Sequence, residues 1–96
     1  MDKYILEKSK RKNKKFVIIM NGNMKHHFGD SRYSDYTIHR DDERKKRYLT
    51  RTSSQPQNDI HSSAFWAKNL LWNKPSLTES IKDVERKFNV KIINKK

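Results

Sequence analysis

The sequence KFVIIMNG, residues 15–22, joins an apolar run to a turn signal. Phenylalanine, valine and isoleucine favour strands, because their aromatic or branched side chains pack well on a pleated surface. Asn21 and Gly22 both tolerate a positive φ, which a two-residue hairpin turn requires. This stretch therefore predicts a strand that ends in a hairpin.

The segments on both sides extend this hairpin to a β-meander. Residues 4–6 are a short apolar run, and the charged residues 9–13 predict a turn between that run and the strand. A third strand is expected over residues 23–28, before Gly29, Asp30 and Ser31 break the sheet. Residues 1–28 thus form a basic N-terminal hairpin region.

Residues 40–51 have the charge order of a helix. Asp41, Asp42 and Glu43 lie where the helix would begin, and the basic residues follow towards its end, which complements the helix dipole. Tyr48 and Leu49 give it only a narrow apolar edge. We expect a central helix whose other sides face solvent or a ligand.

The C-terminal half begins with a polar segment, residues 52–63, that predicts a flexible loop. A helical pair is expected over residues 64–89: an apolar helix stopped before Pro75, then a second helix with a capping box from Ser76 to Glu79 and a left-handed stop at Asn89. Residues 90–93 could return to the sheet as a strand, and residues 94–96 form a basic tail. The predicted class is α+β, in one small domain over residues 1–96.

Charge gives the clearest indication of function. The 96 residues include 23 lysines and arginines but only 11 acids, a formal net charge of +12. Such a chain attracts polyanions, whereas a surface that only keeps a protein soluble usually mixes both signs. We expect a partner that carries phosphates or carboxylates.

Several classes of site are excluded or disfavoured. The chain contains no cysteine, which excludes disulfides, cysteine zinc sites and thiol nucleophiles. Its two glycines form no phosphate loop, and its histidines and acids show no metal-ligand spacing. We therefore predict no enzyme, no cofactor and no metal, and the lack of a long apolar run predicts no membrane partner.

The basic residues form three clusters, over residues 8–15, 40–51 and 91–96. If the hairpin and the central helix project on one side, arginines and lysines would form a stripe along a phosphate backbone. The residues expected to bind nucleic acid are Lys10, Arg11, Lys12, Lys14, Lys15, Arg32, Arg40, Arg44, Lys45, Lys46, Arg47 and Arg51.

Two groups of aromatic residues have alternative interpretations. Phe65, Trp66 and Trp72 could stack on unpaired bases, but so small a domain needs them for its core, which we favour. Tyr33 and Tyr36 are expected to pack where the sheet meets the next helix, with their hydroxyl groups on polar partners.

Charged side chains of the same junction also have two interpretations. Asp30 and Asp35 could accept hydrogen bonds from the backbone or from arginine, and Arg32 could pair internally. The alternative is that Arg32, Tyr33 and Arg40 contact the ligand directly.

Three stretches resemble a family of small basic proteins of large nucleocytoplasmic DNA viruses, including the marseillevirus group. They are residues 27–39 (HFGDSRYSDYTIH), residues 41–49 (DDERKKRYL), and the pair 65–66 (FW) with residues 70–75 (LLWNKP). The resemblance implies a DNA-binding or genome-organising role in the virion, with the host cytoplasm or nucleus as the location during infection. Relatives often carry glycine before Phe-Trp, and histidine after the arginine that matches Arg51; here those positions are Ala64 and Thr52.

Together these observations predict a sequence-nonspecific double-stranded DNA-binding protein that packages or organises a viral genome. One alternative is an adaptor for acidic protein surfaces such as histones or nucleosomes, since this viral group possesses histone-like proteins. Another is an RNA-binding module. A thin core with apolar helix faces would also be compatible with a homodimer.

Overall fold

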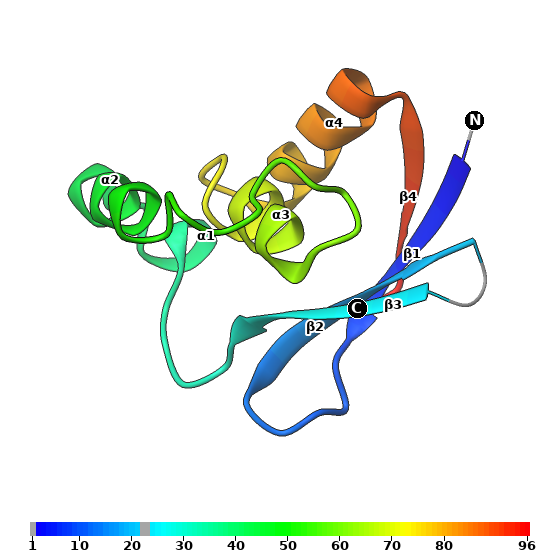
Figure 1. Ribbon diagram of the computed structural model, residues 1–96, viewed down its shortest axis with the longest axis horizontal. Coiled ribbons are helices and arrows are strands. Elements are labelled where there is room, and N and C mark those ends of the chain that lie inside the picture. The colour runs from blue at the N-terminus through cyan, green and yellow to red at the C-terminus, as the bar shows by residue number, and fades with distance from the viewer. Residues whose placement is uncertain (1, 22–23) are drawn as a thin grey trace.

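The apolar runs of the N-terminal region form consecutive strands of one sheet. The computed structural model describes residues 2–21 and 24–96, and it places β1 (Asp2–Lys8), β2 (Lys14–Met20), β3 (Met24–Asp30) and β4 (Val90–Asn94) in the order β3-β2-β1-β4. The helices lie over one face of this sheet (Figure 1). The predicted α+β class is confirmed.

Strand direction divides the sheet into two parts. β1, β2 and β3 form the predicted antiparallel meander, with Leu6 opposite Ile18 and Phe16 opposite Phe28. The return strand β4 is confirmed too, but it runs parallel to β1, with Tyr4 beside Ile92. A parallel pair needs a long crossover, and the helices between β3 and β4 supply it.

The ends of β3 differ from the prediction. Asn21 has a φ of 49°, whereas Gly22 and Asn23, the other predicted turn and strand residues, lie outside the described part of the chain. The break expected after Phe28 is wrong, because β3 continues to Asp30, which pairs with Lys14. Gly29 adopts a φ of 78°, which a glycine tolerates, so the strand turns without leaving the sheet.

The helices follow their capping signals. They are α1 (Tyr36–His39), α2 (Asp42–Arg51), α3 (Ser63–Trp66) continued by the π-helix η1 (Ala67–Leu71), and α4 (Leu77–Phe88). Asp41 accepts the Glu43 and Arg44 amides at the start of α2, Ser76 accepts the Glu79 amide, and Asn89 ends α4 with a φ of 52°. The short helix α1 was not predicted.

The core lies between the sheet and the helices α3, η1 and α4. Leu6, Ile18 and Phe28 of the sheet pack against Trp66, which is fully buried, and Trp66 Nε1 donates to the Ile60 carbonyl. The core interpretation of Trp66 is therefore confirmed. The same hydrogen bond attaches the polar loop of residues 52–63 to the core.

The helix α2 is attached differently, because none of its residues is buried. It lies at one side of the molecule, away from β4 (Figure 1). Tyr48 stacks on Trp72 with ring centroids 4.3 Å apart, and Lys45 Nζ donates to the Asn73 carbonyl over 2.6 Å. Arg44, Lys46 and Arg47 of α2 remain exposed.

Candidate nucleic-acid interface

A cleft of about 410 Å³ separates α2 from the loop after β3. Arg44, Arg47 and Arg51 line it from α2, and Arg32 lines it from the loop. The three helical arginines are spaced i, i+3 and i+7, which places them on one side of a helix. We call this site the arginine cleft; its other lining residues are Tyr33, Ser34, His39, Tyr48 and Trp72.

The arginine cleft carries a strong positive charge. No carboxylate lines it, and Arg44, Arg47 and Arg51 form no ion pair with any described acid. Arg32 differs, since its guanidinium donates to both carboxylate oxygens of Asp30 over 3.0 and 2.8 Å. These hydrogen bonds lower the pKa of Asp30 to about 2, so Asp30 stays charged and neutralises Arg32 at neutral pH.

The cationic surface continues beyond the arginine cleft towards the sheet. An adjoining cleft of about 360 Å³ shares Arg51 with it and adds the exposed Lys14. The two carboxylates that also line it, Asp30 and Asp35, form ion pairs with Arg32 and Lys15. Lys14 also lines a third cleft, of about 580 Å³, with Lys8 and Lys96. The structure thus connects all three predicted basic clusters through Lys14. We call the connected set the basic stripe: Arg44, Arg47, Arg51, Lys14, Lys8 and Lys96.

Three of the predicted binding residues are engaged in the fold instead. Lys15 forms a buried ion pair with Asp35, and only 13% of its side chain is exposed. Lys45 lies 4.8 Å from the Tyr36 ring centroid in addition to its bond to the Asn73 carbonyl. Arg40 donates to the Pro75 carbonyl over 3.2 Å.

The other predicted residues are exposed but lie apart from the arginine cleft. Lys10, Arg11 and Lys12 belong to the turn between β1 and β2, and Lys46 lies on another side of α2. They are available to long-range electrostatic attraction. They do not share the cleft.

The junction between β3 and α2 confirms part of what was predicted for its tyrosine and aspartate side chains. Tyr36 is buried and its hydroxyl donates to Asp42, a hydrogen bond that raises the pKa of Tyr36. Asp35 accepts the Thr37 amide, as expected of a cap. The packing predicted for Tyr33 is wrong, because its side chain is 69% exposed at the mouth of the arginine cleft.

His39 is a lining residue that sequence reasoning did not assign to this site. Its Nδ1 accepts the Asp41 amide over 2.9 Å, and its Nε2 is buried without a partner among the described residues. A backbone amide can only donate, so the neutral ring must carry its proton on Nε2. Because α1 was not predicted, the sequence offered no signal that His39 ends beside α2.

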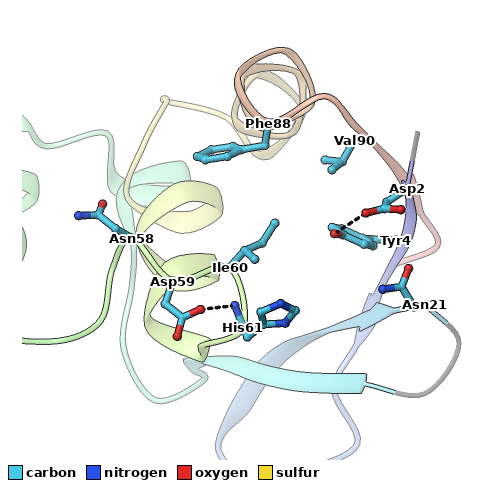
Figure 2. A pocket seen from close by; sticks show the side chains of 9 residues that line it. All are labelled: Asp2, Tyr4, Asn21, Asn58, Asp59, Ile60, His61, Phe88 and Val90. Carbon is cyan, nitrogen blue, oxygen red and sulfur yellow. Dashed lines mark hydrogen bonds between the residues drawn. The ribbon is translucent and has the colours of Figure 1, made fainter.

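A separate pocket at the other end of the strands has the opposite character. It measures about 540 Å³, and Figure 2 shows Asp2 and Tyr4 of β1 on one side and Asp59 and Ile60 on another. Its lining contains no lysine or arginine. Phosphate groups would be repelled there, so this pocket does not belong to the interface.

The described residues contain neither a metal-binding cluster nor a membrane-spanning helix. Over residues 2–21 and 24–96, no group of three or more histidines and acids is arranged to hold a metal ion. In the same part of the chain, no helix is long and apolar enough to span a membrane.

Residues 4–52 match a family of unknown function, DUF5754, over just more than half of the chain. The chain belongs to the DUF5754 family. The matched region contains all four cleft arginines, whereas Trp72, which packs against α2, lies outside it. No curated protein and no solved structure matches the chain.

Proposed function

We propose that the protein binds the phosphate backbone of double-stranded DNA without reading its sequence. The arginine cleft carries this proposal, because it gathers Arg44, Arg47 and Arg51 without a neutralising acid. Arginine forms bidentate hydrogen bonds with phosphate oxygens, and lysine adds point charges. The basic stripe extends these charges along the molecule through Lys14 to Lys8 and Lys96.

The resemblance to small basic proteins of large DNA viruses extends this proposal to a biological role. A protein that neutralises phosphates without base contacts suits the packaging or organisation of a genome, since it binds at any position. Its location would be the virion, and the host cytoplasm or nucleus during infection.

Salt dependence of duplex binding tests the proposal. Fluorescence anisotropy of a labelled duplex would give the affinity at several salt concentrations for the wild type and for the triple variant Arg44→Gln, Arg47→Gln, Arg51→Gln. The slope of log affinity against log salt should become shallower by about 0.9 for each arginine that neutralises a phosphate.

A charge-matched control uses three exposed lysines outside the basic stripe, as Lys3→Gln, Lys25→Gln, Lys82→Gln. This control should keep most of the wild-type slope. If both triple variants lost the same amount, the arginine cleft would not be the binding site. Tighter binding to single-stranded RNA or to nucleosomes than to duplex DNA would favour the RNA or histone alternative instead.

A further inference from the structure

The arginine cleft offers donors and positive charge but no anionic acceptor. Its polar side-chain groups are the arginine guanidinium groups, the His39 ring, the Trp72 indole N–H and three hydroxyl groups, and no carboxylate lines it. A ligand that fits must therefore carry several acceptor oxygens and negative charge. A phosphate group meets both requirements.

His39 adds a donor that the folded chain leaves unused. Its Nδ1 is occupied by the Asp41 amide, which assigns the ring proton to Nε2, and this Nε2–H is buried without a partner among the described residues. A buried donor is normally satisfied by a protein group, water or a ligand. His39 lines the cleft, but Nε2 itself has almost no exposed surface, so we expect Nε2–H to reach a ligand oxygen there only when the ring moves towards the ligand on binding.

Aromatic groups flank these donors. Trp72 lines the cleft and lies 5.3 Å from the His39 ring, and Tyr33 is 69% exposed at its mouth with the Arg32 guanidinium 5.9 Å from its ring centroid. An exposed aromatic ring beside an arginine is a surface on which a base can stack. The volume of about 410 Å³ lies in the range of pockets that hold small molecules, so it admits more than a bare phosphate.

The charge and the donors of the arginine cleft indicate whether it binds an internal or a terminal phosphate. An internal phosphate of a duplex is a monoanion with an ester link on both sides, and both links continue into the double helix. A terminal phosphate has one ester link, a second ionisable oxygen and one more acceptor oxygen. Three unpaired arginines and the buried His39 donor match this second form better.

We infer that the arginine cleft is a binding site for the phosphomonoester of a nucleotide, at a 5′-phosphorylated DNA end or on a free mononucleotide. Arg44, Arg47 and Arg51 bind its oxygens, His39 Nε2–H donates to one of them, and Tyr33 stacks on the adjoining base. This inference rests on the proposed function, the binding of DNA phosphates, and it specifies which form of phosphate the arginine cleft prefers.

The test compares one short duplex with and without its 5′-phosphates, using the intrinsic fluorescence of the full chain. Trp66 is fully buried, so a change on binding reports on Trp72. We expect the phosphorylated duplex to bind about tenfold more tightly, which corresponds to about 1.4 kcal/mol. Arg47→Gln should reduce this ratio towards one, whereas the matched control Lys46→Gln should weaken both duplexes alike and keep the ratio.

NMR of protein labelled with ¹⁵N-histidine gives an independent readout. The His39 Nε2–H resonance should shift on addition of the phosphorylated duplex and remain in place with the unphosphorylated one. Equal affinity for the two duplexes and an unmoved His39 resonance would overturn this inference, while salt-dependent binding of both duplexes would leave the proposed function intact.

If neither duplex binds, the proposed function fails. The inference of a phosphomonoester site is then tested with small ligands alone. Saturable quenching of Trp72 by a deoxynucleoside 5′-monophosphate, with none by the unphosphorylated nucleoside, would support a mononucleotide site. Absence of that quenching would overturn the inference as well.

Discussion

Tyr48 of α2 stacks on Trp72 with an angle of 6° between the ring planes, and this pair connects the most basic helix to the core. Because α2 buries none of its own residues, its position depends on a few contacts: this stack, the Lys45 bond to the Asn73 carbonyl and the hydrogen bond from the Tyr36 hydroxyl to Asp42. Arg44 and Arg47 are exposed on the same helix. The geometry of the arginine cleft therefore depends on an aromatic contact between residues 24 positions apart.

Replacing Tyr48 by alanine should loosen the attachment of α2 and weaken DNA binding. A stacked aromatic pair contributes about 0.5–1.5 kcal/mol beyond the area that it buries, so we expect a loss of about 2 kcal/mol in the free energy of unfolding, measured in urea. Duplex affinity should also fall, because Arg44, Arg47 and Arg51 are no longer held opposite Arg32. Tyr48→Phe keeps the ring and should retain both properties; equal losses in the two variants would assign the effect to the hydroxyl group.

Local signals in the sequence predicted the elements, and non-local contacts decided the site. The strand over residues 14–20 and the caps at Asp41 and Ser76 depend on neighbouring residues alone, and they could be predicted. The parallel pairing of β1 with β4 depends on a crossover that periodicity does not encode. The same holds for the stack of Tyr48 on Trp72.

Adjacent lysines show why the site residues were only partly predictable. Lys14 is exposed in the basic stripe, whereas Lys15 is buried against Asp35; on α2, Lys46 is exposed while Lys45 contacts Tyr36. Strand and helix periodicity separate such neighbours onto different sides. The tertiary fold decides which of two neighbouring lysines packs against another element and which faces solvent. The charge clusters in the sequence alone therefore could not distinguish the exposed lysines from those engaged in the fold.

The pair Lys14 and Lys15 gives a matched test of this division. Lys15→Gln leaves the carboxylate of Asp35 buried without its cation, and we expect a loss of about 3 kcal/mol in the free energy of unfolding, the low end for a broken buried ion pair. Lys14→Gln should leave stability within about 0.5 kcal/mol of the wild type and should weaken duplex binding. Denaturant unfolding and anisotropy would measure both variants, and the reverse pattern would remove Lys14 from the basic stripe.

Gly29 permits the close approach of β3 to η1. A Cβ atom at this position would lie 2.6 Å from Leu71 Cδ1, and the φ of 78° is unfavourable for any residue with a side chain. Gly29→Ala should therefore cost about 2 kcal/mol of stability, with thermal unfolding as the measurement. Because Leu71 is itself a buried core residue, Leu71→Ala is measured beside the double variant Gly29→Ala, Leu71→Ala. The cost of Gly29→Ala in the Leu71→Ala background then reports the φ penalty without the contact, which separates the two causes.

Acid should destabilise the protein through Asp83, which is buried in α4. Its carboxylate accepts from Asn73 Nδ2 over 2.8 Å and from Arg86 over 2.6 Å, and Lys87 lies 3.1 Å away. These contacts hold the pKa of Asp83 well below its ordinary value, the Asn73 hydrogen bond first among them. The stabilisation is linked to α2 as well, because the Asn73 carbonyl is the acceptor for Lys45.

The sign of the pH effect follows from this lowered pKa. The unfolded state has the ordinary aspartate pKa of about 4, so below that pH it binds a proton that the folded state still excludes. The contribution of Asp83 is thus complete above about pH 5 and is lost as the pH falls through 4 towards the lower pKa of the folded state.

Urea unfolding of the wild type at a series of pH values between about 6 and 2 should show this decline. Asp83→Asn should be less stable at neutral pH and should show a shallower decline, whereas Asp59→Asn, at an exposed loop carboxylate, should follow the wild type. Parallel curves for the wild type and Asp83→Asn would mean that other carboxylates cause the acid sensitivity.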